Sequence, residues 1–559
     1  LGAVCGALLG LSFPHFGIPS LAWLAPGLIL FSALGRSGGE AFSIGDVAGV
    51  FRNLISLYWL LLIPFPAGAI AGWLALSAYL SFFSGIWVWF LWWIYPKAGR
   101  DSSRAPVSGA GALFDDFLAT MPAQRLVWAL MAAATWVGLE IIQGRFLTGF
   151  PWNFLGASQY EMLPLIQMAS VTGVYGISFL VAWFSVTLTS ALIFLMRRPG
   201  ARRAFLGELL PPVVVLMLVL LYGFHLIFQP QRIARTLKVA LVQPSIPQTL
   251  IWDTNQNAVR FEQLMQLSEA ALATKPDLLI WPEAAVPTLL RYDFSSDYAN
   301  YRAITNMLSR HNAWMILGAD DLEPRLETPE PNDADFFNSA FLLSPEGKFK
   351  GHYRKQRLVI FGEYVPLSHY LPFLQYLTPI EGGFTSGKEP VDFEIPSPKV
   401  KTSVLICFED TFPHLTRQHV DSDTDFLVNL TNNGWFGESA AQWQHAANAV
   451  FRAVENGLPL VRCANNGLTC WVDRVGRLHE VYFGASRNIY GAGFKTAQIP
   501  LLPEKGVREP TIYNLHGDWF GWSCLAVSVL WGIAQRVSAR NVSIRTIPFG
   551  QSDLPSSND

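Results

Sequence analysis

The sequence predicts a helical membrane bundle that carries one α/β domain. Only 15% of the 559 residues are charged, whereas a soluble domain has about 25%. Long apolar runs fill the chain up to residue 230 and return at 517–535, while residues 237–510 have the polarity of a water-soluble domain with alternating strands and helices. The low average charge therefore combines two parts that face different solvents.

The composition also excludes several classes of protein. With 51% hydrophobic residues and a mean hydropathy of +0.28, the chain is neither disordered nor typical of a wholly soluble enzyme. The 40 Lys and Arg residues against 42 Asp and Glu leave no basic excess for nucleic-acid binding. Five cysteines are too few for a disulfide framework. The 20 tryptophans fit a membrane protein, because membrane interfaces are enriched in tryptophan.

Eight segments are candidates for membrane-spanning helices, which need about 20 mostly apolar residues. They are residues 1–13, 18–35, 45–64, 69–95, 126–143, 165–196, 209–228 and 517–535. The first is short and a cleaved signal peptide is the alternative, but no Ala-x-Ala-like site follows a basic region, which favours a span. The expected organisation is residues 1–230 with about seven spans, 237–510 as the α/β domain, 517–535 as the last span and 536–559 as a cytoplasmic tail with a disordered end at 548–559.

Basic residues alternate between the loops of this bundle, and Lys and Arg mark the cytoplasmic side of a membrane protein. Loops 65–68 and 144–164 hold only Arg145 between them. The other set of loops contains Arg36, Lys97, Arg100, Arg104, Arg125, Arg197, Arg198, Arg202, Arg203, Arg536, Arg540 and Arg545. The α/β domain then lies on the opposite face, which in a bacterium is the periplasm. Arg52 departs from the pattern and is expected to face a polar pocket or the interface.

The α/β domain is expected to alternate strands and helices. Apolar runs with little alternation are typical of strands buried on both faces by helices. The expected strands are 237–243, 277–281, 314–318, 339–343, 403–407, 426–430 and 460–463, with a final hairpin at 468–483 that turns at 473–476. The expected helices are 254–274, 298–311 and 439–456.

Three segments of this domain carry residues with reactive side chains. Glu283 follows the strand 277–281, Lys355 precedes the stretch 361–363, and Cys407 ends the strand 403–407. A cysteine becomes a nucleophile when a base removes its proton and a positive charge stabilises the thiolate. Glu283 could be that base, while Lys355 and the backbone N–H of Phe408 could stabilise an oxyanion. Each residue alone also fits a structural role, and spacing does not pair them.

The sequence around these residues resembles the Glu–Lys–Cys constellation of the nitrilase superfamily over about residues 237–500. The matching segments are Trp281-Pro282-Glu283, Lys355 with Phe361-Gly362-Glu363, and Cys407-Phe408-Glu409. With the flanking spans, the stretches 242–253, 358–366, 432–437 and 456–467 resemble the membrane-bound branch of that superfamily that N-acylates bacterial lipoproteins. The resemblance implies a four-layer αββα sandwich carried on eight membrane helices.

The resemblance also implies roles for individual residues. Glu283 is the general base, Lys355 stabilises charge and Cys407 is the nucleophile that accepts the acyl group. Glu363 orients Lys355 or assists the base. Glu409 and Trp252 support the site or contact substrate, and Trp435 lies on a loop that moves. The sequence departs from the family pattern at Phe408, Ile360 and Asn433, where Tyr, Pro and Asp are usual, which affects only the finer positioning of substrate.

The reaction that the resemblance implies is a two-step acyl transfer. Cys407 takes an acyl chain from a membrane phospholipid as a thioester, and the N-terminal amine of a diacylglyceryl-modified apolipoprotein then takes it as an amide. The implied location is the bacterial inner membrane, with the catalytic domain on the periplasmic side. The histidines show no metal-ligand spacing and no dinucleotide or Walker motif occurs, so we expect no metal and no cofactor.

The stretch 361–384 is unusually rich in large apolar residues. Alone it fits a buried helix under a loop, but beside membrane spans we expect a lipid-facing arm that shields the thioester from water. Cys463 and Cys470 are expected to be packed thiols, with a disulfide as the alternative. Two rival functions are a membrane-anchored amidase that passes the acyl group to water, and a transporter or receptor whose outer domain only binds ligand.

Overall fold

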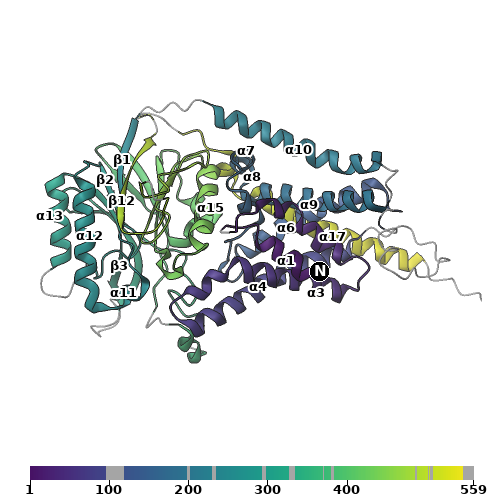
Figure 1. Cartoon of the computed structure of the whole chain (residues 1–559), viewed down its shortest axis with the longest axis horizontal. Coiled ribbons are helices and arrows are strands. Elements are labelled where there is room, and N and C mark those ends of the chain that lie inside the picture. The colour runs from purple at the N-terminus through teal and green to yellow at the C-terminus, as the bar shows by residue number, and fades with distance from the viewer. Residues whose placement is uncertain are drawn as a thin grey trace, which may run out of the picture.

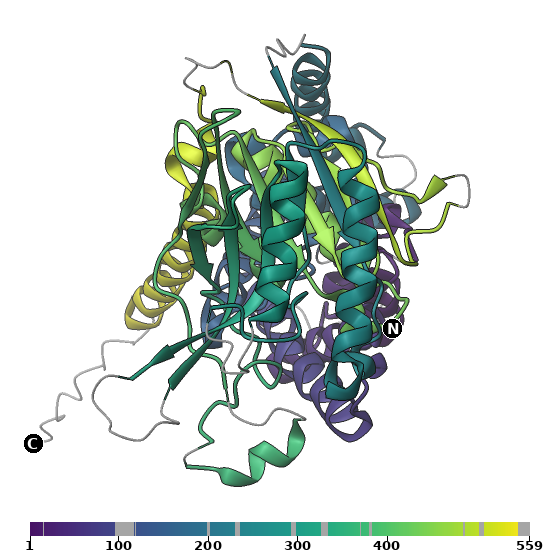
Figure 2. The ribbon, with the colours of Figure 1, turned by 90° about the vertical axis from the view of Figure 1, so that its left-hand side faces the viewer.

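The computed structural model shows a helical bundle joined to an α/β sandwich (Figures 1 and 2). It describes residues 1–545 except 15, 96–116, 118, 198–201, 230–234, 292–297, 326–333, 369, 379–382, 485–486, 502 and 504–507. Lys97, Arg100, Arg104, Arg198 and the end of the expected tail, 548–559, lie outside these residues.

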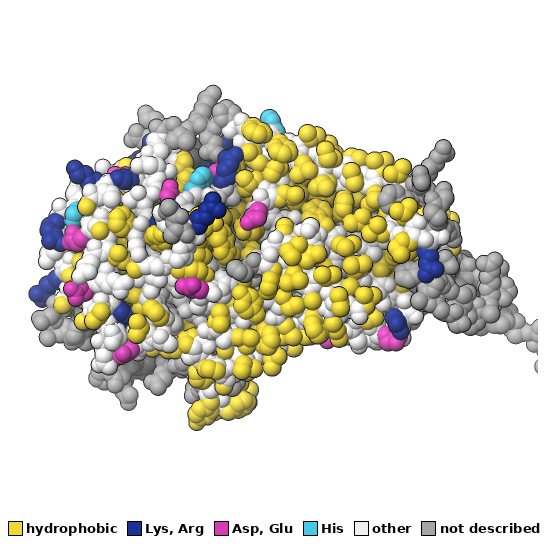
Figure 3. All heavy atoms as spheres, in the orientation of Figure 1, with side chains coloured by type: hydrophobic (Ala, Val, Ile, Leu, Met, Phe, Trp, Pro, Cys, Tyr) yellow, Lys and Arg dark blue, Asp and Glu magenta, His cyan; other side chains and the backbone are white. Residues whose placement is uncertain are grey.

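The bundle is built from the N-terminal 228 residues and one C-terminal helix. Its longer helices are α3 (Gly38–Ser56), α4 (Pro66–Trp93), α6 (Pro122–Gln143), α9 (Val174–Arg197), α10 (Arg202–Phe228) and α17 (Trp519–Arg545). Short elements join them: α1 (Gly2–Gly10), η1 (Pro19–Trp23), α2 (Ala25–Ser32), η2 (Tyr58–Leu62), η3 (Phe146–Thr148), η4 (Leu155–Gln159), α7 (Leu163–Ile166) and α8 (Ala169–Thr172). Hydrophobic side chains cover this half of the molecule in Figure 3.

Four helices in the described part of the chain are long and apolar enough to cross a membrane: Pro66–Trp93, Pro122–Gln143, Val174–Arg197 and Leu206–Phe228. The expected spans 1–13 and 18–35 instead form helices of nine and eight residues, each shorter than a bilayer requires. The expected span 165–196 is interrupted at Gly173, whose φ of +67° breaks the helix before Val174. The last helix continues past the expected boundary at 535, to Arg545.

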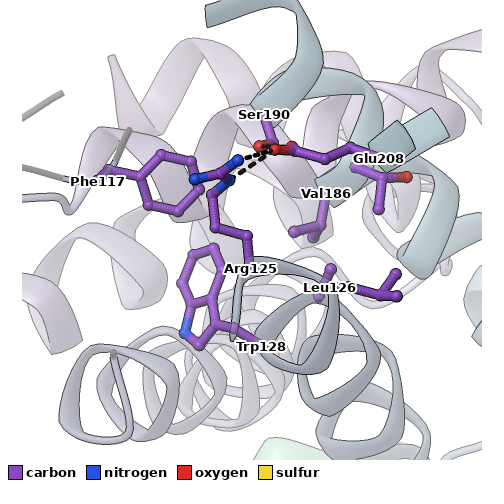
Figure 4. Close-up of a pocket in the computed structure, with 9 residues that line it drawn as sticks. Phe117, Arg125, Leu126, Trp128, Val186, Ser190 and Glu208 are labelled. Atoms are coloured by element: carbon purple, nitrogen blue, oxygen red, sulfur yellow. Dashed lines mark hydrogen bonds and ion pairs between the residues drawn. The ribbon is translucent and has the colours of Figure 1, made fainter. Parts of the chain in front are cut away.

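Arg125, expected to mark a cytoplasmic loop, is instead buried inside the bundle. Its side chain is 3% exposed and pairs with Glu208 of α10, with an Nη2–Oε1 distance of 2.6 Å. Ser190 of α9 donates a hydrogen bond to the same carboxylate (Figure 4). A charge in an apolar bundle is stabilised by such a partner, so Arg125 ties α10 to its neighbours. Arg52 is buried too, and donates to the carbonyl oxygen of Asn153.

The sandwich contains two six-stranded sheets. The first has the strand order β12-β1-β2-β3-β4-β5 and the second β11-β10-β9-β8-β7-β6. The first sheet consists of β1 (Arg235–Gln243), β2 (Leu278–Ile280), β3 (Trp314–Pro324), β4 (Ala334–Leu343), β5 (Phe349–Arg354) and β12 (Gly493–Leu501). The second consists of β6 (Asp392–Ile395), β7 (Val400–Ile406), β8 (Phe426–Thr431), β9 (Leu460–Ala464), β10 (Cys470–Val472) and β11 (Leu478–His479).

Helices cover both outer faces, which completes the expected αββα layers (Figure 2). Helices α12 (Asn257–Leu272) and α13 (Ala299–His311) share an apolar cluster with the first sheet. Helix α15 (Ala441–Asn456) packs on the second sheet through a second apolar cluster, and this second cluster continues into α6, α7 and α9 of the bundle. A third cluster fills the space between the sheets. Helix α15 therefore belongs to the sandwich and to the membrane interface at once.

The central strands and the three helices expected from the sequence are confirmed within a few residues. Strands β5, β6 and β12 were not expected, because their sequences mix charged and polar residues with few apolar ones. They lie at or near the sheet edges, where partial exposure relaxes the demand for apolar residues. Cys463 and Cys470 are buried free thiols.

Candidate active site

Cys407 sits at a sharp turn between β7 and the short helix η7 (Cys407–Thr411). Its φ of +55° is rare for a residue with a side chain, and strained backbone of this kind is common at active sites. The turn leaves the side chain half-buried. Thr431, at the end of neighbouring β8, donates a hydrogen bond to the sulfur, with an Oγ1–Sγ distance of 3.6 Å.

Glu283, Lys355 and Glu363 form one buried cluster. Lys355 Nζ lies 3.2 Å from Glu283 Oε1 and 2.9 Å from Glu363 Oε1. The amide of Asn338 donates to both carboxylates at 2.8 Å, and the backbone N–H of Asn432 donates to Glu283 Oε2 at 2.8 Å. The cluster joins segments that follow β2, β5 and β8, together with β4, so the sandwich itself assembles it.

Glycine makes room for the approach of Glu283. A Cβ at Gly318 of β3 would lie 2.5 Å from the carbonyl oxygen of Pro282 and 2.7 Å from the Cα of Glu283. Such contacts are too short for any side chain, so the backbone that carries the carboxylate can pack here only against glycine.

The charges of the cluster shift the pKa of its neighbours. Burial opposes the charge of Lys355, but Glu283 and Glu363 outweigh it and hold the pKa of Lys355 well above its usual value. Burial and then Glu283 raise the pKa of the Cys407 thiol to about 12, against an opposite effect of Lys355. The resting cysteine is therefore a neutral thiol, and its proton must leave during attack. Burial and the two glutamates also raise the pKa of Asp320 to about 7.

Glu409 lies in the interior of the sandwich, next to the turn of Cys407. It is fully buried and accepts hydrogen bonds from Tyr353 and from the backbone N–H groups of Gln356, Arg357 and Ile406, at 2.7–3.0 Å. It thus ties the segment after β5, which carries Lys355, to the strand that carries Cys407. Burial raises its pKa to about 7 in spite of these donors.

Of the aromatic residues expected at the site, Phe408 is the one that contacts the charged cluster. Phe408 is half-buried, and Lys355 Nζ lies 5.9 Å from the centre of its ring. Trp252 and Trp435 contact each other edge to face, with ring centres 5.3 Å apart. Phe436, next along the chain, packs on Trp59 of the bundle at 4.5 Å. The loop of Trp435 therefore lies between the site and the membrane helices.

The stretch 361–384 projects from the sandwich beside α4 (Figures 1 and 3). It includes the short helix η6 (Pro372–Leu377). Several of its large apolar side chains are exposed: Leu367, Tyr370, Leu371, Phe373 and Tyr376, the last at 84%. Its first turn carries Glu363, which connects this stretch directly to Lys355.

Sequence reasoning missed several polar residues around the site: Asn338, Asp320, Asn429, Asp410, His445 and Arg462. Asn338 and Ser339 interrupt the apolar run 336–343 of β4, and a polar residue inside a buried strand is a usable signal for a site. His445 and Arg462 give no comparable signal, because scattered His and Arg residues are common in helices and strands. Among the described residues, no group of three or more His, Cys, Asp or Glu side chains could hold a metal ion.

The α/β sandwich is a domain of the carbon-nitrogen hydrolase class. The sequence model of that family, "Carbon-nitrogen hydrolase", matches residues 238–496, and "Apolipoprotein N-acyltransferase N-terminal domain" matches residues 5–187. The chain is 34% identical to an apolipoprotein N-acyltransferase of Geobacter metallireducens, over 94% of this chain and 93% of the relative. A second relative of that name, from Chlorobaculum tepidum, is 29% identical over 97% of both chains. The chain belongs to the apolipoprotein N-acyltransferase family.

Solved structures of the nitrilase superfamily match about half of the chain. An amidase of Nesterenkonia AN1 is 16% identical, covering 48% of this chain and 92% of the amidase, with a TM-score of 0.34. A carbon-nitrogen hydrolase superfamily protein of Xanthomonas campestris is 18% identical, covering 47% of this chain and 91% of that protein, with a TM-score of 0.34.

Proposed function

We propose that this protein transfers an acyl chain from a membrane phospholipid to the N-terminal amine of a diacylglyceryl-modified apolipoprotein. The observation that carries the proposal is the Glu283–Lys355–Cys407 cluster in a sandwich packed onto apolar helices through one shared core. The relatives' name supplies the reaction class. An amidase would not need this membrane contact, nor an exposed apolar arm beside its site.

In the first step, Cys407 Sγ attacks the carbonyl carbon of the phospholipid ester. Glu283 takes the thiol proton, and Lys355 and the N–H of Phe408 stabilise the oxyanion of the tetrahedral intermediate. The bond from that carbon to the glycerol oxygen then breaks. Glu283 returns the proton to the leaving oxygen, which releases a lysophospholipid and leaves a Cys407 thioester.

In the second step, the lipoprotein amine attacks the thioester carbonyl. Glu283 removes a proton from the amine, the carbon–sulfur bond breaks, and the proton returns to Cys407. An amide and the free thiol result, and the ping-pong sequence divides one difficult transfer into two easier ones. Glu363 holds the Lys355 ammonium towards the reacting carbonyl, while Trp252, Trp435 and Phe408 guide the apolar chains.

The proposed setting is the inner membrane of a bacterium, with the sandwich on the periplasmic side and eight segments that cross or enter the bilayer. Of the loops expected on the sandwich side, 65–68 has no basic residue and 144–164 has only Arg145. That arginine pairs with Asp518, whereas Arg36 and Arg197 lie at helix ends away from the sandwich. This distribution supports a periplasmic catalytic face. The short helices α1 and α2 would then complete the bundle as part of the expected spans 1–13 and 18–35.

The test is to incubate the purified protein with a phospholipid labelled in its acyl chain. We expect a hydroxylamine-sensitive label on wild-type protein and none on Cys407→Ala. Addition of a diacylglyceryl peptide with a free N-terminus should move the label to the peptide. Absence of label on the wild type would overturn transfer from phospholipid, and label that leaves only to water would identify a hydrolase instead.

A further inference from the structure

The carbonyl oxygen of Cys407 is held by two buried side chains that the reaction above does not use. Asn429 of β8 donates from Nδ2 to this oxygen at 2.8 Å. His445 of α15 approaches it with Nε2 at 3.1 Å. Both side chains are fully buried, so neither of them contacts substrate.

The orientation of both donors is determined by a closed ring of hydrogen bonds. Arg462 Nη1 donates to Asn429 Oδ1 at 3.0 Å and to Asp410 Oδ2 at 2.9 Å. Because an arginine only donates, the oxygen of Asn429 faces Arg462 and its NH2 group faces Cys407. His445 Nε2 also lies 2.7 Å from Asp410 Oδ1. Since both neighbours of Nε2 are acceptors, this nitrogen carries the hydrogen.

This ring fixes the peptide between Cys407 and Phe408. In a trans peptide, the N–H group points opposite to the C=O group. With the carbonyl of Cys407 directed into the sandwich, the N–H of Phe408 points out towards the reacting thiol. That N–H is the second of η7, and the N–H groups of the first turn have no partner within their helix. It is therefore available to an oxyanion.

We propose that Asn429 and His445 are positioning residues that orient the Cys407–Phe408 peptide, so that the Phe408 N–H and Lys355 together receive the acyl oxygen. The assignment rests on the proposed acyl transfer at Cys407, but it holds for any acyl donor. It gives the ring a specific chemical effect: stabilisation of the oxyanion rather than activation of the thiol.

The experiment compares two rates in the purified full-length protein. One is pre-steady-state acylation of Cys407, by a phospholipid and separately by a p-nitrophenyl ester. The other is alkylation of Cys407 by iodoacetamide, which needs no oxyanion donor. The variants are Asn429→Asp, which keeps the contact with Arg462 but turns the donor to Cys407 into an acceptor, and His445→Gln, whose amide can still donate. His445→Met removes the donor.

A matched control is Asn456→Asp, the same change at a fully buried asparagine of α15 that donates to the carbonyl of Arg452, away from the site. We expect the rates of acylation by the phospholipid and by the p-nitrophenyl ester to fall about 100-fold in Asn429→Asp and His445→Met. This is the usual effect of losing one hydrogen-bond donor to the oxyanion. Alkylation should stay near the wild-type rate in both variants. His445→Gln should retain most acylation, and Asn456→Asp should leave the ratio of the two rates unchanged.

Two results would overturn the proposal: acylation near the wild-type rate in Asn429→Asp, or a loss of alkylation equal to the loss of acylation. The second would show that the ring merely supports the structure of the turn. If Asn429→Asp fails to fold, the pair His445→Gln and His445→Met decides, because equal rates in those two variants contradict a positioning role. If the wild type accepts the p-nitrophenyl ester but not phospholipid, the proposed function fails while this inference is still tested.

Discussion

At the scale of single residues, the site combines a neutral nucleophile with a buried cation and two carboxylates. Burial, and then the negative charge of Glu283, keeps the proton on Cys407 at rest. The carboxylate of Glu283 is also the proposed acceptor of that proton. Glu283 therefore has two opposite effects: it disfavours ionisation of the resting thiol, but it accelerates attack by accepting the proton of the thiol. They can therefore be separated by experiment.

Glu283→Gln should change alkylation and acyl transfer in opposite directions. Removing the carboxylate lowers the pKa of Cys407, because Glu283 is one of the causes that raise it to about 12. More thiolate is then present at any pH below that value, so iodoacetamide should react faster. Acyl transfer should fall by about 100-fold or more, because the general base is lost. Rates that move in the same direction would contradict this dual role.

The wild-type pH profile provides a second check on the state of the thiol. Because a pKa of about 12 leaves the thiol neutral through the physiological range, the alkylation rate should rise about tenfold per pH unit between pH 7 and 10. A plateau below pH 9 would mean that Lys355 stabilises the thiolate more strongly than the structure indicates.

Glu409→Gln should be destabilising although it conserves shape. Both oxygens of this carboxylate accept hydrogen bonds, from Tyr353 and from three backbone N–H groups. A glutamine NH2 group in the same place must therefore face another donor in a buried site. We expect a loss of about 1–3 kcal/mol in the free energy of unfolding, measured by thermal denaturation in detergent. Glu394→Gln, on an exposed position of β6, is the control; an equal effect in both would refute the structural role.

At the scale of elements, the strands and helices with strong apolar patterns could be predicted from the sequence, and so could the strand ends that carry Glu283 and Cys407. The helix breaks at Leu57 and Gly173 could not, because an apolar run does not reveal where a helix stops inside it. Asn429 and His445 were also invisible, since their role depends on two elements that meet only in the folded sandwich. The periodicity of apolar residues indicates which face of an element is buried. It does not indicate that two buried polar side chains, from different elements, contact the same carbonyl oxygen.

The arm formed by residues 361–384 is expected to bring the site to lipid. Replacing Leu367, Phe373 and Tyr376 together with serine removes exposed apolar surface and little packing. We expect a several-fold higher KM for phospholipid vesicles, because less apolar area enters the bilayer. Acylation by a soluble p-nitrophenyl ester should be unchanged. A matched loss with both donors would show that the arm supports the site itself.

At the scale of the whole molecule, Gln444 is one of the side chains that connect the sandwich to the bundle. Gln444 of α15 accepts hydrogen bonds from Trp59 and Trp152 and donates to the carbonyl oxygens of Pro14 and Ser56. Its neighbour His445 packs against Trp152, with ring centres 5.0 Å apart, and reaches the carbonyl of Cys407. The membrane helices are therefore one residue away from the turn that holds the nucleophile.

Gln444→Leu should destabilise the full-length protein by about 2–4 kcal/mol, because several buried donors and acceptors lose their partner. The check is the Tm in detergent. His516→Leu, near the start of α17 and outside this contact, is the control.

Residues 235–501 expressed alone should be poorly soluble, since the outer face of α15 would then expose its share of the common core. A soluble, well-folded fragment would contradict this coupling.

The burial of α15 between sandwich and bundle also holds Cys407 at one fixed distance from the apolar helices. A catalytic domain on a flexible linker would take many positions relative to the helices. Here packing fixes the position of Cys407 Sγ, and the arm of residues 361–384 projects from the sandwich. The ester carbonyls of a phospholipid occupy a narrow zone between head groups and chains. On the proposed function, a phospholipid that diffuses sideways into the site meets a thiol that is held at one depth. The fixed depth of the thiol would then select which ester bond is attacked, before any side chain recognises the lipid.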